Sequence, residues 1–110
     1  MKISILLPYK ENFSSTKAGA VSLYVKDITS NSKFKKNIKI YGETQANKTF
    51  LSNFIHLDTK DKFYLSKTKV YINEFLKREK KEKSAIIEIH NRPSYVSQIR
   101  SISNSRIIIY

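Results

Sequence analysis

Short apolar runs alternate along the chain with longer amphipathic stretches, a pattern typical of strands that alternate with helices. The first run, residues 3–7, ends at Pro8, which has no amide hydrogen to offer a neighbouring strand. The pattern predicts strands at residues 3–7, 38–41, 54–57, 85–89 and 106–110.

Helices are predicted in three of the intervening stretches. The first begins near Gly19, and the third begins near Pro93, because a proline suits the first helical turn. The second starts with Asp61 and ends in Lys and Arg residues, so the charges at both ends suit the helix dipole. The apolar stripes of the three helices are Val21, Tyr24, Val25 and Ile28; Tyr64, Leu65, Thr68, Tyr71, Ile72, Phe75 and Leu76; and Tyr95, Ile99 and Ile102.

The alternation predicts an α/β fold: a three-layer, Rossmann-like parallel sheet of about five strands with right-handed crossovers. A length of 110 residues fits one domain. The final run, residues 107–110, does not alternate with polar residues, which predicts a strand buried on both faces, yet no residues follow to supply a covering helix. We therefore expect a sheet that is incomplete at its C-terminal end. The alternative is an edge strand that a neighbouring molecule covers, which implies self-association through the C-terminal strand.

The net charge of +12 favours nucleic acid, anionic lipid or phosphorylated substrates as partners. The same abundance of lysine, isoleucine and asparagine also arises from an AT-rich genome without any binding function. The absence of cysteine excludes disulfides and thiolate metal sites, and the two histidines lie far apart in the sequence, so we expect no metal. No segment reaches the roughly 18 apolar residues that span a bilayer, and a cytoplasmic location is expected.

Several common active sites are excluded by their missing motifs. The chain has no G-x-x-x-x-G-K-[ST], G-x-G-x-x-G, G-x-S-x-G or H-E-x-x-H sequence. The first strand is followed by Pro8, Tyr9 and Lys10 rather than by the acidic pair of a phosphoryl-accepting receiver.

Two loops at the predicted carboxyl edge of the sheet carry the candidate binding residues. Lys17 and Gly19 open the first helix, where free amides and the helix dipole favour a phosphate; the alternative is that Gly19 only starts the helix. His90, Asn91 and Arg92 follow the fourth strand, at the edge where open α/β sheets bind ligands. His90 is alternatively a polar strand terminus. Glu88 alternates with apolar neighbours, which favours a structural ion pair over a general base.

Together these loops resemble a known family. Lys-Ala-Gly-Ala followed by Val-Ser-Leu-Tyr-Val-Lys-Asp-Ile, with the later Ile-Glu-Ile-His-Asn-Arg-Pro, resembles the N-terminal Rossmann-like domain of a GT-B glycosyltransferase. The closest family is glycosyltransferase family four, whose members are retaining and use nucleotide sugars. The resemblance implies that Gly19 lies near the donor phosphates and the acceptor, and that His90 lies near the transferred sugar as a catalytic residue. It also implies that Asn91 and Arg92 contact acceptor or phosphate. Many relatives have two adjacent glycines where this chain has Ala18 and Gly19.

The resemblance also implies a two-domain enzyme with its active site between the domains. Residues 1–110 would form part of the N-terminal, acceptor-side domain, and the C-terminal donor domain would be absent. The parent protein would move a sugar from a nucleotide-sugar donor to a cell-envelope glycan or lipid-linked acceptor, as in lipopolysaccharide or polysaccharide biosynthesis, without a cofactor. We expect the chain alone to be inactive.

The second predicted helix has a flank of apolar and basic residues, formed by Phe63, Lys67, Val70 and Lys77, that suits an anionic membrane surface. This flank implies a peripheral location at the inner face of the cell membrane; the alternative is a solvated helix. A rival function is a basic nucleic-acid-binding module, supported by the charge and the aromatic content. The aromatics fall mostly on predicted core faces and no RNA-binding signature is present, so this class is less favoured. A purely structural interaction module is a third class.

Overall fold

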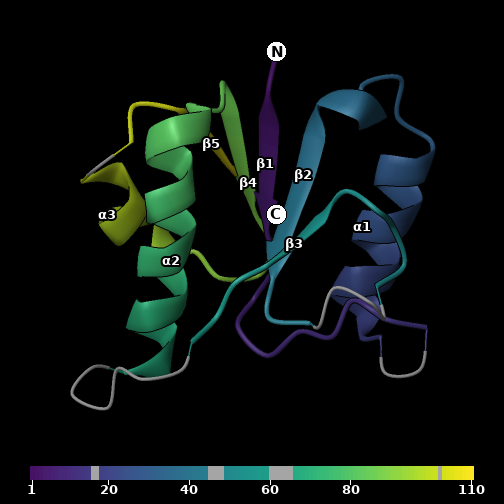
Figure 1. Cartoon of the computed structure of the whole chain (residues 1–110), viewed down its shortest axis with the longest axis horizontal. Coiled ribbons are helices and arrows are strands. Elements are labelled where there is room, and N and C mark those ends of the chain that lie inside the picture. Colours follow the sequence, from purple (N-terminus) through teal and green to yellow (C-terminus); the bar gives the residue numbers. More distant parts are fainter. Residues whose placement is uncertain (16–17, 45–48, 60–65, 102) are drawn as a thin grey trace.

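The computed structural model describes residues 1–15, 18–44, 49–59, 66–101 and 103–110. Its strands form one parallel sheet in the order β3-β2-β1-β4-β5. They are β1 (Ile3–Leu6), β2 (Ile38–Gly42), β3 (Phe54–His56), β4 (Ile86–Ile89) and β5 (Arg106–Ile109). The predicted strands are confirmed, and the fold is α/β with an open, Rossmann-like sheet (Figure 1).

Helices on both faces of the sheet make three layers. One face is covered by α1 (Ala20–Ser30), and the other by α2 (Lys67–Glu82) and α3 (Tyr95–Arg100) (Figure 1). A short 3-10 helix, η1 (Lys35–Asn37), precedes β2. The helices lie on opposite faces because right-handed crossovers lead in opposite directions along the sheet. α1 joins β1 to β2, on one side of β1, and α2 joins β3 to β4, on the other side of β1.

The start of α2 differs from the prediction. Its N-cap is Ser66, whose hydroxyl accepts a hydrogen bond from the Lys69 amide at 3.2 Å, and the helix begins at Lys67. Serine is favoured there because its oxygen satisfies an amide that has no partner within the helix. Outside the described residues lie the predicted start at Asp61, the stripe residues Tyr64 and Leu65, and Ile102 of the third helix.

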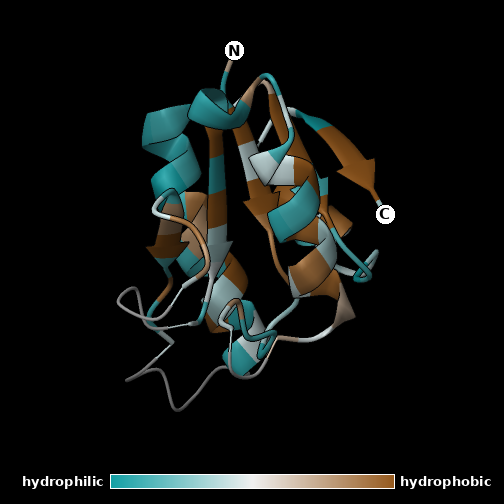
Figure 2. Ribbon diagram, turned by 90° about the vertical axis from the view of Figure 1, so that its right-hand side faces the viewer, coloured by the Kyte–Doolittle hydropathy of each residue, from teal (hydrophilic) through white to brown (hydrophobic). Residues whose placement is uncertain are grey.

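The core consists of two apolar clusters on opposite faces of the sheet, and β1 contributes to both, as a central parallel strand does. The α1 side contains Ile3, Ile5, Leu7, Phe13, Val25, Ile38, Ile40 and Phe54. The other side contains Leu6, Tyr41, Leu57, Tyr71, Ile72, Phe75, Leu76, Ile87, Ile89, Tyr95 and Ile99. Figure 2 shows the strands coloured largely as hydrophobic.

The prediction that Val70 belongs to a membrane-facing flank of α2 is wrong. This side chain is 2% exposed and is enclosed together with Tyr71 and Ile72, so the buried arc of α2 is wider than a single stripe. Lys67 Nζ donates to the Thr59 carbonyl oxygen at 3.1 Å, which holds the segment after β3 beside the first turn of α2. Lys77 is exposed and pairs with Glu74 at 3.2 Å, and Phe63 lies outside the described residues.

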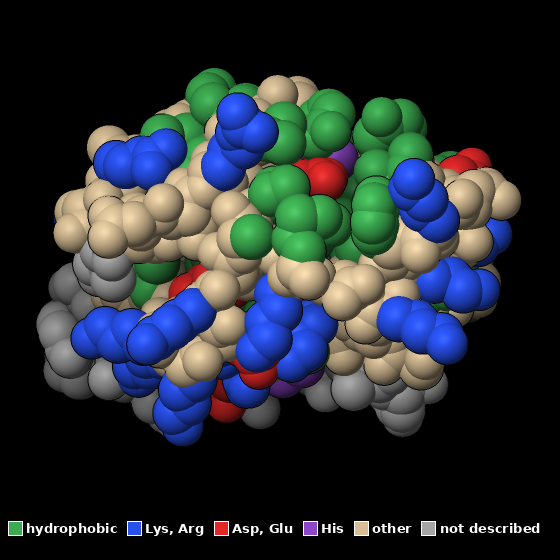
Figure 3. Space-filling model, turned by 90° about the horizontal axis from the view of Figure 1, so that it is seen from above, with side chains coloured by type: hydrophobic (Ala, Val, Ile, Leu, Met, Phe, Trp, Pro, Cys, Tyr) green, Lys and Arg blue, Asp and Glu red, His purple; other side chains and the backbone are tan. Residues whose placement is uncertain are grey.

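Lys and Arg side chains are spread over the face shown in Figure 3, where hydrophobic side chains also gather around an acidic and a histidine side chain. The large apolar side chains described as exposed are Met1, Leu23, Tyr24, Phe34, Ile109 and Tyr110. No helix in the described part of the chain is long and apolar enough to cross a membrane.

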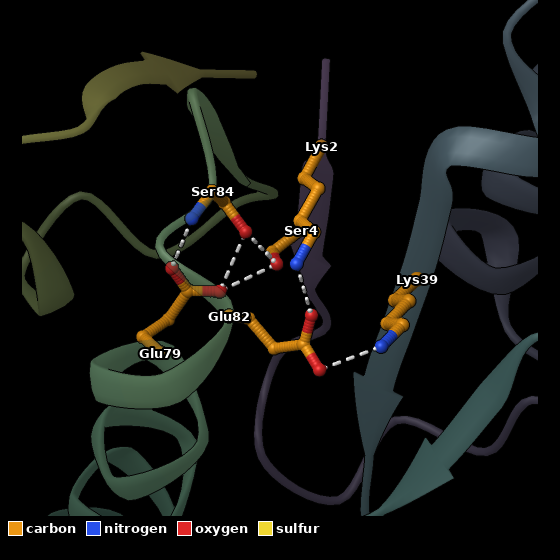
Figure 4. Close-up of polar contacts among 6 residues, drawn as sticks. All are labelled: Lys2, Ser4, Lys39, Glu79, Glu82 and Ser84. Carbon is orange, nitrogen blue, oxygen red and sulfur yellow. Dashed lines mark hydrogen bonds and ion pairs between the residues drawn. The ribbon is translucent and has the colours of Figure 1, made fainter.

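A buried carboxylate joins α2 to the centre of the sheet. Glu79 is 5% exposed, and its Oε1 accepts hydrogen bonds from the hydroxyls of Ser4 at 2.6 Å and Ser84 at 2.7 Å (Figure 4). The Ser84 amide donates to Oε2 at 3.1 Å. Ser4 lies in β1 and Ser84 shortly before β4, so one side chain connects the last turn of α2 to two neighbouring strands.

Glu82 makes a second, more exposed bridge one turn further on. Lys39 Nζ donates to its Oε1 at 2.8 Å and Lys2 Nζ to its Oε2 at 3.2 Å (Figure 4). The hydrogen bonds from Lys39 and then Lys2 lower the pKa of Glu82. Since both lysine side chains are about half exposed, solvent screens these pairs and their contribution to stability is small.

We expect Glu79→Ala to destabilise the fold by about 3 kcal/mol, because it leaves buried hydroxyl and amide donors without an acceptor. Glu82→Ala is the matched control and should cost less than about 1 kcal/mol. Urea unfolding followed by circular dichroism measures both. Equal losses in the two variants would show that the buried carboxylate is not the stronger contact.

We also expect stability to fall at alkaline pH through Tyr41. Burial, followed by the charge of Glu79, raises the pKa of Tyr41 to about 12. A raised pKa means that the contribution is complete below the ordinary tyrosine pKa of about 10 and is lost as pH rises through about 12. Urea midpoints measured between these pH values should fall in the wild type and fall less in Tyr41→Phe. An identical pH dependence in both proteins would contradict this assignment.

Candidate functional site

The candidate site lies at the carboxyl edge of the sheet, where the strand order reverses between β1 and β4. In open α/β sheets a crevice for ligands forms at such a topological switch point. Gly19 opens α1 after the loop that follows β1, and His90 directly follows β4. The Tyr9 amide donates to the Tyr95 hydroxyl oxygen at 3.0 Å, which ties the first of these loops to α3. The fold thus brings Gly19, His90, Asn91 and Arg92 to one edge, while Lys17 lies outside the described residues.

His90 is almost fully enclosed, with 3% of its surface exposed. Its ring stacks on that of Tyr110 with centroids 4.7 Å apart and an interplanar angle of 10°, and the Tyr24 ring lies 6.0 Å away. Nε2 lies 3.4 Å from Glu88 Oε1. A carboxylate in this position accepts the Nε2 hydrogen and fixes the orientation of the ring.

Glu88, Tyr24 and Tyr110 are the members of this cluster that were not assigned to the site from the sequence. Glu88 and His90 are two residues apart around a strand end, and that spacing places them on one face of the sheet, so the pair is readable from the sequence. Burial, then the charge of Glu88 and then Tyr24, raise the pKa of Tyr110. The position of the Tyr110 ring depends on the pairing of β5 with β4, which no local pattern specifies.

Asn91 and Arg92 lie in the turn that follows β4. Asn91 has a φ of 57°, and its amide donates to the Tyr110 carbonyl oxygen at 2.8 Å. The Arg92 guanidinium folds back and donates to the Asn91 carbonyl oxygen at 2.7 Å. The amide of Asn91 is therefore already used, whereas the Arg92 side chain is exposed and solvated.

The amino end of α1, where a phosphate was expected, holds a carboxylate of the protein itself. Glu11 Oε2 accepts hydrogen bonds from the Gly19 amide at 3.2 Å and from the Ser22 amide at 3.1 Å. A Cβ on Gly19 would lie 2.8 Å from this oxygen. Gly19 has an ordinary φ of −85°, so backbone freedom does not require a glycine here, and the effect of an added Cβ would be to displace the end of the Glu11 side chain.

Among the described residues, no group of three or more His, Cys, Asp or Glu side chains could hold a metal ion. The described polar groups around His90 include its imidazole, the Glu88 carboxylate and the hydroxyls of Tyr24 and Tyr110. Such groups bind hydroxyl-bearing ligands through hydrogen bonds and orient them.

Comparisons with family models, curated proteins and solved structures found no match to this chain. The fold defines its class, an α/β protein with an open parallel sheet, and the functional interpretation depends on the residues at the carboxyl edge.

We expect Glu11→Ala and Gly19→Ala each to cost about 1 kcal/mol in urea unfolding, because either change removes the acceptor from the amides that begin α1. The Gly19 and Ser22 amides should exchange hydrogen faster in both variants. When Glu11→Ala is already present, Gly19→Ala should lower the free energy of unfolding by almost nothing more, because both changes remove the same interaction. Additive losses would show that the two residues act independently.

Proposed function

We propose that this chain forms the acceptor-side wall of the active-site cleft in a retaining, nucleotide-sugar-dependent glycosyltransferase of the GT-B type. The observation that carries the proposal is the enclosed His90, paired with Glu88 at the carboxyl end of β4 and beside the switch point of a parallel sheet. The resemblance described from the sequence assigns the same histidine to the neighbourhood of the transferred sugar.

In this proposal His90 binds a hydroxyl group of the sugar and holds it in place, while Glu88 and the Tyr110 ring fix the imidazole. The transfer would keep the anomeric configuration of the sugar. It would depend on electrostatic stabilisation of the departing diphosphate rather than on a pair of carboxylates that form a covalent intermediate. Glu11 occupies the amides at the start of α1, so the diphosphate would be held mainly by the donor domain. The resemblance places most nucleotide contacts in that domain.

The acceptor in the parent protein would be a cell-envelope glycan or a lipid-linked sugar, at the inner face of the cell membrane. With Val70 buried, any membrane contact of α2 would depend on its basic residues rather than on an apolar flank. The nucleic-acid alternative is weakened because most described aromatic side chains are buried, which leaves Tyr24, Phe34 and Tyr110 as the exposed rings among them.

The test is a titration of the ¹⁵N-labelled chain with UDP-glucose, GDP-mannose and a short single-stranded RNA. We expect the nucleotide sugars to shift amide signals of the loops after β1 and β4, and His90→Ala to weaken this binding about tenfold, or about 1.4 kcal/mol. Lys81→Ala, an exposed change on α2, is the control and should leave it unchanged.

No transfer or hydrolysis of the nucleotide sugar by the chain alone is expected, because the proposed cleft needs a second wall. Measurable turnover would contradict this expectation. Tight, salt-dependent binding of the RNA with no response at the two loops would favour a nucleic-acid-binding module instead.

A further inference from the structure

The α1 side of β4 and β5 has no helix over it in the part of the chain that the structure describes. Figure 2 shows β5, the strand that ends at the C label, beyond the edge of α1. The pairing register places three rows on this side: Ile86 with Arg106, Glu88 with Ile108, and His90 with Tyr110. We call this surface the β4–β5 face.

The β4–β5 face continues into an apolar flank of α1. Leu23 is 48% exposed, Tyr24 49% and Tyr110 54%, and the rings of Tyr24 and Tyr110 lie 6.4 Å apart. Figure 3 shows hydrophobic side chains gathered around an acidic and a histidine side chain on the face that it draws. A contiguous apolar patch of this kind typically marks an interaction site.

The two parts of the patch fit each other as helix and sheet. α1 buries Val25 and Thr29 against its own sheet, which leaves Leu23, Tyr24 and Asp27 on its exposed side. The β4–β5 face lies beside α1 on the same side of the sheet. The exposed side of one α1 therefore complements the β4–β5 face of another copy.

We propose that the β4–β5 face binds α1 of a second copy of this chain in a symmetric dimer. A two-fold axis parallel to the strands turns α1 of each copy over the partner's β4 and β5, so the two helices lie side by side between the two sheets. The contact is isologous, since each copy contributes the same helix and the same sheet face. Leu23 and Tyr24 of one copy then pack on Ile108 and Tyr110 of the other.

Charge complementarity selects a second copy as the occupant. Asp27 and Arg106 are both exposed, and neither side chain forms an ion pair with another described residue. α1 runs opposite to the strands, as a crossover between parallel strands requires, so Asp27 lies toward the amino ends, where Arg106 begins β5. The proposed axis leaves positions along the strands unchanged. At about 1.5 Å per helical residue and about 3.3 Å per strand residue from the contact between Tyr24 and Tyr110, Arg106 lies about 9 Å further toward the amino ends than Asp27. The long Arg106 side chain covers this distance, so that each Asp27 meets the partner's Arg106.

The interface is nearly neutral although the chain carries +12, because Asp27 and Glu88 offset Arg106 within it. Repulsion between the two copies then comes from lysines outside the contact. At an ionic strength of about 0.15 M, charges more than about 8 Å apart are largely screened, so the dimer should be measured at that salt concentration.

Charge reversal and mixing test the proposal. Sedimentation equilibrium and native mass spectrometry should show a dimer for the wild type and monomers for Asp27→Arg and for Arg106→Asp, each examined alone. A mixture of the two variants should form a heterodimer, because both interfacial pairs then again join opposite charges: the unchanged Arg106 of one copy meets the unchanged Asp27 of the other, and the two substituted positions form the second pair with its signs exchanged. Lys81→Glu, a charge reversal on the exposed side of α2, should leave the dimer intact.

A heterodimer forms only if both variants are folded, so the mixing result separates loss of the interface from loss of the fold. A monomeric wild type at high micromolar concentration would overturn the proposal and leave the face to another occupant. A dimer that survives both single reversals would place self-association elsewhere and would overturn it as well. Neither result depends on binding of nucleotide sugars, so the proposed function is tested separately.

Discussion

The hydrogen-bonded carboxylate of Glu79 is the contact on which the arrangement of the central strands depends. A carboxylate in a nearly dry site is costly unless its lone pairs are filled, and here two serine hydroxyls and one amide fill them. Because these donors come from β1 and from the approach to β4, the last turn of α2 is fixed against both strands at once. The switch point at their opposite ends, and with it the position of His90, follows from this pairing.

The layout of the fold was predictable from the sequence because it depends on local patterns. Short apolar runs mark strands, and an alternating order of strands and helices leaves few parallel arrangements. Burial on both faces holds for β1, whereas β4 is fully buried on one face only and β5, expected to be buried on both faces, is partly exposed. The burial of Val70 was not predictable, because this side chain lies off the regular apolar stripe of α2 and its exposure is decided by tertiary packing. Glu79 was also missed, since a glutamate near the basic end of a helix is indistinguishable from its exposed neighbours until Ser4 and Ser84 are brought to it.

The candidate site, too, was only partly predictable from the sequence. The position of His90 after a strand, and its shared face with Glu88, follow from the period of a strand. The contact between Glu11 and the start of α1 spans an irregular loop whose conformation no periodic pattern encodes. This contact changes the chemistry of the edge, because an anion binding there would have to displace a carboxylate. The edge is therefore better suited to neutral hydroxyl groups than to phosphate, a distinction that the glycine alone does not reveal.

The turn at Asn91 couples the outermost strand to the interior of the site. The Asn91 amide is bound to the carbonyl oxygen of Tyr110, whose ring stacks on His90, and the Tyr110 amide is bound to the Ile89 carbonyl oxygen. Main chain and side chain thus form one closed loop of contacts around the imidazole. A displacement of β5 would therefore carry the Tyr110 ring with it and take away the surface on which the His90 ring stacks.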